Sequence, residues 1–88
     1  MKIIKPAKAG TMESNDIYVM IMPNENSNIE LELESIVMKQ FGEEIEKVIR
    51  ETLASLDVSS AIVKVQDKGA LNYTIRARIE TAVKRASM

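Results

Sequence analysis

Residues 16 to 23 are apolar on both faces of an extended chain, and this feature constrains the fold most strongly. Alternate side chains of a strand point to opposite faces. The two faces would therefore carry Ile17, Val19 and Ile21 on one side and Tyr18, Met20 and Met22 on the other. Such a strand is either central in a sheet with both faces covered, or it presents one face to a partner. Its period of two argues against an all-helical bundle.

Two further strands and two helices are expected downstream. Residues 29 to 34 alternate between aliphatic residues and glutamate, which predicts an amphipathic strand, and residues 60 to 66 predict a third strand. Between them, apolar residues recur at helical spacing, so a helix should begin between residues 35 and 42 and end near residue 56. A second helix is predicted from residue 70 to about residue 87.

The element order β-β-α-β-α predicts one α+β domain, residues 1–88, built as a two-layer sandwich with both helices on one face. The turn cluster after Pro23 predicts a hairpin or meander between the first two strands. With the third strand beside the first, the order is 2-1-3 and the small sheet is mainly antiparallel. Residues 1–15 are predicted to be an extended lead-in followed by a loop.

Composition argues against several classes of function. Twelve basic residues stand against 13 acidic residues, for a net charge of −1, which disfavours nucleic-acid binding. The chain lacks cysteine and histidine, so the usual Ser-His, Cys-His and zinc sites are not available and we expect neither catalytic residues nor a metal site. No stretch approaches the ~20 apolar residues of a membrane span, so a soluble cytoplasmic protein is expected.

Ser14 lies in the polar segment Ala9-Gly10-Thr11-Met12-Glu13-Ser14-Asn15-Asp16, directly before the first predicted strand. A serine in a polar turn usually caps or turns the backbone through its hydroxyl. Exposed loops are also where modified residues occur. From the residues alone both roles stay open, and the neighbouring Glu13 and Asp16 are either solvated charges or recognition elements.

This segment closely resembles the signature of the acyl carrier (gamma) subunit family of citrate lyase. Two other segments are similar to recurrent parts of that family: Gln40-Phe41-Gly42 before the long helix, and Asp67-Lys68-Gly69-Ala70-Leu71 followed by Arg76-Ala77-Arg78. The matches keep the same order and extend from residue 6 to residue 86.

The resemblance implies a non-catalytic carrier. Ser14 matches the serine that carries phosphoribosyl-dephospho-coenzyme A through a phosphodiester bond, with Glu13 and Asp16 as candidate recognition residues. The thiol of that group carries acetyl, which the alpha subunit exchanges for citryl, and the beta subunit then releases oxaloacetate. The implied partners are these two subunits and the transferase that attaches the group. Asn15 stands where relatives often have a second serine or a glycine, so Thr11 is the one other hydroxyl in the segment.

Other interpretations stay open. One is a small α+β interaction module that docks through an open sheet face, with Met20 and Met22 as adaptable contacts. An RNA-binding domain and an autonomous hydrolase are less well supported, because the chain has few aromatic residues and no positioned base. Arg76, Arg78 and Arg85 either meet the pyrophosphate of the arm or form the solvated face of the second helix.

Overall fold

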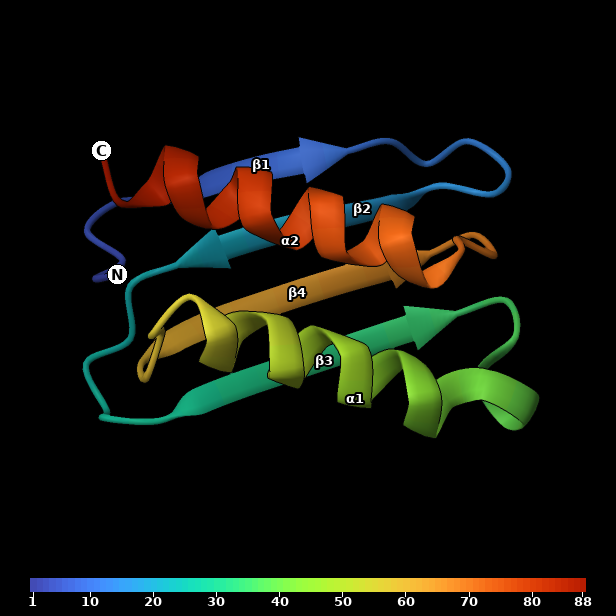
Figure 1. Ribbon diagram of the computed structural model, residues 1–88, viewed down its shortest axis with the longest axis horizontal. Helices are drawn as coiled ribbons and strands as arrows, with labels where there is room; N and C mark the ends of the chain where they lie inside the picture. The colour runs from blue at the N-terminus through green and yellow to red at the C-terminus, as the bar shows by residue number, and fades with distance from the viewer.

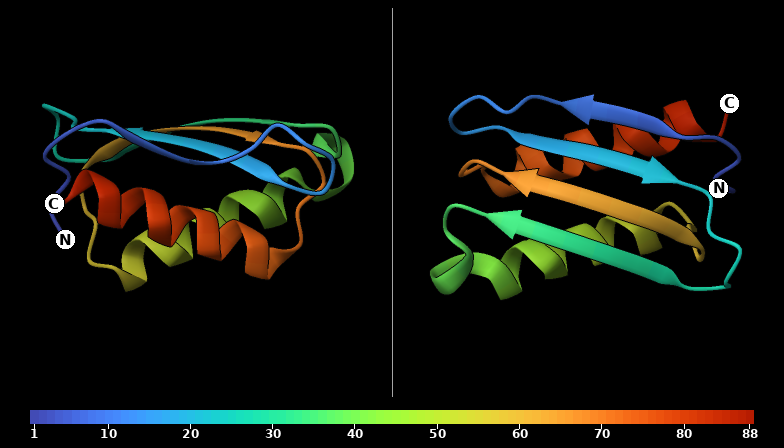
Figure 2. Two further views of the ribbon diagram at one scale, coloured as in Figure 1. Left: turned by 90° about the horizontal axis from the view of Figure 1, so that it is seen from above. Right: turned by 180° about the vertical axis from the view of Figure 1, so that it is seen from behind.

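The computed structural model describes all residues, 1–88, as two helices packed on one face of a four-stranded sheet (Figure 1). The elements in chain order are β1 (Ala7–Gly10), β2 (Ile17–Met22), β3 (Ile29–Ser35), α1 (Met38–Ser55), β4 (Ala61–Asp67) and α2 (Asn72–Ala86). The second face of the sheet is open (Figure 2). The predicted α+β class is confirmed. Neither helix combines the length and the apolar character that crossing a membrane requires.

The strand order is β1-β2-β4-β3, and the predicted order 2-1-3 is wrong. β4 pairs antiparallel with β2, as expected, but it also pairs parallel with β3, so the sheet is mixed. No hairpin joins β2 to β3, because β4 lies between them. Their connection passes the start of β4, where the Ser60 hydroxyl donates to the main-chain oxygens of Asn24 and Asn26 over 3.2 and 2.7 Å.

The sequence of β3 suits an edge of the sheet, the position that it has in both the predicted and the observed order. Its aliphatic side chains are only half-buried, whereas Val63 of the central strand β4 is fully buried. Its glutamates lie on the exposed side, and outward charges protect a sheet edge from pairing with other chains. Glu32 lies opposite Lys64 with 3.6 Å between carboxylate and ammonium, a charge pair that the predicted hairpin would not form.

β1 is the strand that the sequence did not reveal. It lies within the predicted lead-in and pairs antiparallel with β2 at the other edge of the sheet. Its four residues include Lys8 and Gly10, so they show no sustained apolar alternation. α2 packs across β1 and β2, and Ala9 of β1 is buried, as is Ile3 ahead of this strand.

The core lies between the sheet and the helices. The apolar stripes of both helices face it, as predicted, and the fully buried members include Ile49 and Leu53 of α1 and Ile75 and Ile79 of α2. The first residue of each predicted stripe is an exception. Phe41 is 48% exposed and Leu71 is 59% exposed, so the core ends before the N-terminal turns of the helices.

Asp67 joins three parts of the fold at the end of β4. Its carboxylate is buried and accepts hydrogen bonds from the Ser35 hydroxyl (2.7 Å) and from the N–H groups of Gly69 (3.1 Å) and Ala70 (2.9 Å). Gly69 adopts φ 90°, a backbone conformation that glycine takes without strain. The carboxylate thus connects the end of β3 to the turn that leads into α2.

Replacement of Asp67 by alanine should lower the free energy of unfolding by about 3 kcal/mol, because it leaves three partly buried donors without an acceptor. Urea denaturation of the wild type and of Asp67→Ala measures the difference. Glu30→Ala, on the exposed side of β3, is the control and should change stability by less than about 0.5 kcal/mol. A similar small effect at Asp67 would contradict the assigned role of its carboxylate.

Candidate functional site

Three connections meet at one end of the sheet, opposite the end that holds both termini (Figure 1). They are the β1–β2 loop, the β3–α1 turn and the β4–α2 turn. The Asn15 N–H donates to the main-chain oxygen of Lys68 over 2.8 Å, and the Lys68 N–H donates to the main-chain oxygen of Asp16 over 2.9 Å. Two segments that are more than fifty residues apart in the chain therefore form one surface.

Ser14 lies at the centre of a tight turn in the β1–β2 loop. The Asp16 N–H donates to the Glu13 oxygen over 3.1 Å and closes the turn around Ser14 and Asn15. Asn15 has φ 65°, in the left-handed region that asparagine tolerates better than most residues. Ser14 is exposed, and its hydroxyl forms no hydrogen bond within the chain.

Thr11 carries the second hydroxyl of the loop, and this one is engaged. Its Oγ1 donates to Asp16 Oδ2 over 2.7 Å and accepts from the Glu13 N–H over 3.2 Å. These two hydrogen bonds tie the Thr11 hydroxyl to the loop, whereas the Ser14 hydroxyl has no such bond. The geometry therefore separates two residues that look alike in the sequence.

Asp16 anchors the loop to α2 through a two-point ion pair with Arg78. The distances are 3.0 Å from Nε to Oδ1 and 2.8 Å from Nη2 to Oδ2, and the Ile17 N–H donates to Oδ1 over 2.7 Å. The hydrogen bonds from Arg78, with smaller contributions from Thr11 and Ile17, lower the pKa of Asp16 from 3.8 to about 2 against the opposing effect of burial. The same contact raises the pKa of Arg78.

The two candidate recognition residues thus have different surroundings. The Asp16 side chain is 13% exposed and both of its oxygens are occupied by the chain itself. Glu13 is exposed and has no ion-pair partner. A binding partner has direct access to Glu13, whereas Asp16 is available only if its bonds to Arg78 and Thr11 open.

Gly10 allows β1 to end close to the start of β2. Its φ is 88°, and a Cβ atom at this position would lie 1.8 Å from the Ile17 oxygen. That separation is far below van der Waals contact, so only glycine fits between the strand and the Asp16 anchor.

The three arginines of α2 have different roles. Arg78 holds Asp16, and Arg85 donates to the main-chain oxygen of Lys8 over 2.8 Å. Arg76 is exposed and forms neither an ion pair nor a hydrogen bond with the chain. Of the three residues that the sequence left undecided, Arg76 is the one whose guanidinium forms no bond within the chain.

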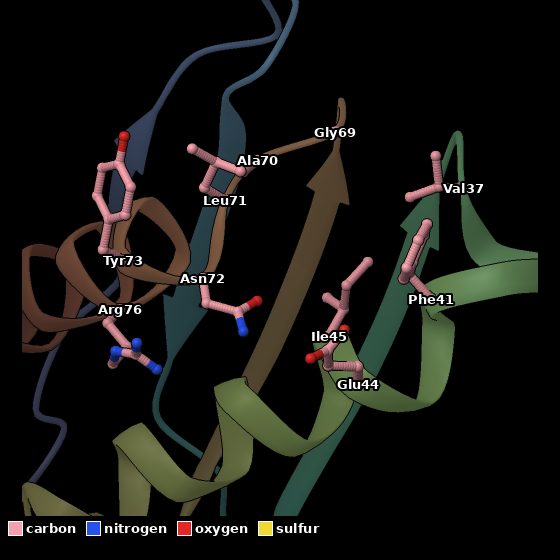
Figure 3. Close-up of a pocket in the computed structure, with 10 residues that line it drawn as sticks. All are labelled: Val37, Phe41, Glu44, Ile45, Gly69, Ala70, Leu71, Asn72, Tyr73 and Arg76. Atoms are coloured by element: carbon pink, nitrogen blue, oxygen red, sulfur yellow. The ribbon is translucent and has the colours of Figure 1, made fainter.

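A groove of about 480 Å³ opens beside the Ser14 loop, between the N-terminal turns of the two helices (Figure 3). Six of its ten lining residues are hydrophobic, and Tyr73 and Phe41 stand on opposite sides of it. Gly69 lines the groove and also borders the loop, since a Cβ atom there would lie 3.7 Å from Asn15 Oδ1. The sequence did not reveal the groove because helical periodicity assigned Phe41 and Leu71 to the core.

Comparison with known proteins identifies the relatives of this chain. A family model described as malonate decarboxylase delta subunit (MdcD) matches residues 4–86. The citrate lyase acyl carrier protein of Clostridium perfringens is 55% identical over 99% of this chain and 86% of its own length. Citrate lyase acyl carrier protein 2 of Salmonella typhimurium is also 55% identical, over 99% of this chain and 90% of its own.

A solved structure shares the fold at much lower identity. It is the crystal structure of a Pseudomonas malonate decarboxylase hetero-tetramer in complex with malonate. One of its chains superposes with a TM-score of 0.80 at 16% identity, covering 98% of this chain and 92% of that one. The four-stranded sheet with two helices is thus a known architecture.

The Asp16–Arg78 pair predicts a pH-dependent effect of Arg78→Ala. Because the folded-state pKa of Asp16 lies below its ordinary value, the pair stabilises fully above about pH 4, and the stabilisation is lost as pH falls toward 2. At neutral pH the variant should lose about 1–2 kcal/mol, since partial exposure of Arg78 screens the pair. The gap between wild type and variant in urea denaturation should narrow below about pH 4.

Arg50→Ala is the matched control for this prediction. Arg50 forms an exposed ion pair with Glu46 one helical turn away, with 2.8 Å between Nε and Oε2. Such pairs contribute about 0.3–0.5 kcal/mol. An equal effect of the two substitutions, or a gap for Arg78→Ala that is independent of pH, would show that the Asp16 contact does not stabilise the fold.

Proposed function

This chain belongs to the citrate lyase acyl carrier protein family, and we propose that it serves citrate lyase through an arm attached to Ser14. It is a carrier subunit of a multi-subunit enzyme and not a catalytic one. In this proposal residues 1–88 form a single acyl carrier domain, and the β1–β2 loop is its prosthetic-group loop. The arm is phosphoribosyl-dephospho-coenzyme A, and the substrate of the complex is citrate.

The observation that carries the proposal is the state of the two hydroxyls in the loop. A phosphodiester linkage needs a hydroxyl that a transferase can reach and that the fold can spare. Ser14 meets both needs, because it is exposed and its hydroxyl forms no hydrogen bond, whereas the Thr11 hydroxyl is held by Asp16 and Glu13. The residues present therefore fit the group.

Attachment is a substitution at phosphorus. The Ser14 oxygen forms the new bond to the phosphorus of an activated precursor, and its proton passes to a base of the transferase. The leaving group departs with the electron pair of the broken P–O bond. The chain has no histidine, and the Asp16 carboxylate is occupied by Arg78 and Thr11, so in this proposal the transferase supplies the base.

Once attached, the arm supplies a thiol that bears acetyl or citryl as a thioester. The chain has no cysteine, so it cannot provide this thiol itself. The ion pair between Asp16 and Arg78 holds the loop that carries the attachment site against α2. Tethering then raises the effective concentration of the acyl group at the alpha and beta subunits of the lyase, which are the proposed partners.

Glu13 is the proposed recognition residue for the transferase. It precedes Ser14, is exposed and lacks an intramolecular partner. We assign Asp16 a positioning role, because its carboxylate is engaged with Arg78. In this arrangement Asp16 holds the turn and Glu13 presents a charge beside the reactive hydroxyl.

Ser14→Ala should abolish attachment, and Thr11→Ala should retain it. Each variant and the wild type would be coexpressed with the citrate lyase prosthetic-group transferase and its precursor, and intact mass spectrometry would detect the adduct. Ser14→Ala should change the free energy of unfolding by less than about 0.5 kcal/mol, because the hydroxyl is exposed and forms no hydrogen bond.

Two outcomes would contradict this proposal in different ways. An adduct on Ser14→Ala would place the attachment on another residue. Absence of the adduct from the wild type, with a functional transferase verified on an authentic citrate lyase carrier, would remove the carrier arm itself.

A further inference from the structure

We propose that the groove between the N-terminal turns of α1 and α2 binds the adenine nucleotide portion of the carrier's own arm. This inference rests on the proposed function and names a site that holds the adenine nucleotide of the arm against the protein. The groove is separate from the attachment turn but adjoins it through Gly69.

The position of the groove favours this occupant. Ser14 is next to Asn15, whose Oδ1 lies 3.7 Å from the point where Gly69 would carry a Cβ atom, and Gly69 is part of the groove wall. In phosphoribosyl-dephospho-coenzyme A the adenosine follows the ribosyl phosphate, so it is the part of the arm closest to the serine after that linker. A short tether keeps it at high effective concentration beside the groove.

The apolar and aromatic lining of the groove suits a purine ring. Tyr73 is 68% exposed and Phe41 is 48% exposed, and they face the groove from different helices (Figure 3). Aromatic faces stack on nucleobases without requiring a particular sequence. Leu71, which is 59% exposed, adds apolar surface between them.

The charges along the groove orient the ligand. Arg76 is the one cation in the lining and has no partner in the chain, so it can pair with the pyrophosphate. Glu44 is the one carboxylate in the lining. It repels phosphate and accepts a hydrogen bond from an exocyclic amine, which places the base toward α1 and the pyrophosphate toward Arg76 on α2. Asn72 adds an amide on the same side (Figure 3).

Binding at this site would confine the nucleotide and leave the pantetheine portion projecting. The groove residues therefore determine the direction in which the thioester leaves the carrier. Binding of the nucleotide would also explain why Tyr73 and Phe41 are exposed in the chain alone, because large apolar groups gathered at a surface mark a binding site.

The test uses free dephospho-coenzyme A and the unmodified, ¹⁵N-labelled full chain. We expect saturable amide shifts in residues 37–45 and 69–76, and no saturable shifts on the open sheet face around Met20. Arg76→Ala and Tyr73→Ala should each raise the dissociation constant about tenfold. Arg50→Ala should leave it unchanged, and retained spectral dispersion would show that each exposed-site variant is folded.

A second measurement separates this inference from the proposed function. The spectrum of the carrier modified at Ser14 is compared with that of the unmodified chain, and intact mass reports the modification independently. Groove shifts in the modified carrier that vanish in Arg76→Ala would support the site. Two results would overturn the inference. One is a carrier that gains the adduct without shifts in the groove. The other is free dephospho-coenzyme A that produces no saturable groove shifts, and a groove that binds a catalytic subunit instead of the nucleotide would give both results.

Discussion

The insertion of β4 between β2 and β3 determines where every functional group of this protein lies. In the observed register, Ile17 at the start of β2 and Ser35 at the end of β3 both lie opposite Asp67 at the end of β4. The β1–β2 loop, the β3–α1 turn and the β4–α2 turn are thereby brought to one end of the sheet. Had β3 paired with β2 instead of β4, Ser35 would not lie opposite Asp67, and the β3–α1 turn would not adjoin the β4–α2 turn. The pairing of Asn15 and Asp16 with Lys68 continues the β2–β4 ladder into the functional end.

Local patterns in the sequence predicted the elements, and contacts between distant residues decided their order. Alternation identified β2, β3 and β4, and helical spacing identified both helices, because side-chain burial imposes these periods. β1 escaped detection because four residues with a lysine and a glycine carry no period. The turn cluster after Pro23 suggests a hairpin, yet the segment spans β4 and is held by Ser60. Periodicity also does not show where a core ends, so the sequence did not predict that Phe41 and Leu71 would be exposed.

The candidate site divides in the same way. A resemblance of short segments was enough to single out Ser14, but it could not show which hydroxyl of the loop is hydrogen-bonded and which is not. That distinction depends on Asp16, which occupies Thr11 and is itself held by Arg78, 62 residues away. A charge pattern does not reveal which acid pairs with which base at such a separation. The sequence does not distinguish the three arginines of α2. Because α2 packs over β1 and β2, two of them bond to the β1–β2 region of the chain, whereas Arg76 forms no bond within the chain.

A carrier must accept a large anionic group without disturbing its fold, and the surroundings of Ser14 suit the attachment that we propose there. The Ser14 side chain contributes no hydrogen bond to the folded state, so converting its hydroxyl to a phosphodiester removes no stabilising contact. The new negative charge would arise near Asp16, but Arg78 already neutralises that carboxylate at 2.8 Å. Repulsion is thereby reduced at the proposed attachment point. The ion pair thus has two effects that reinforce each other: it orders the turn from beneath, and it permits a further anion above it.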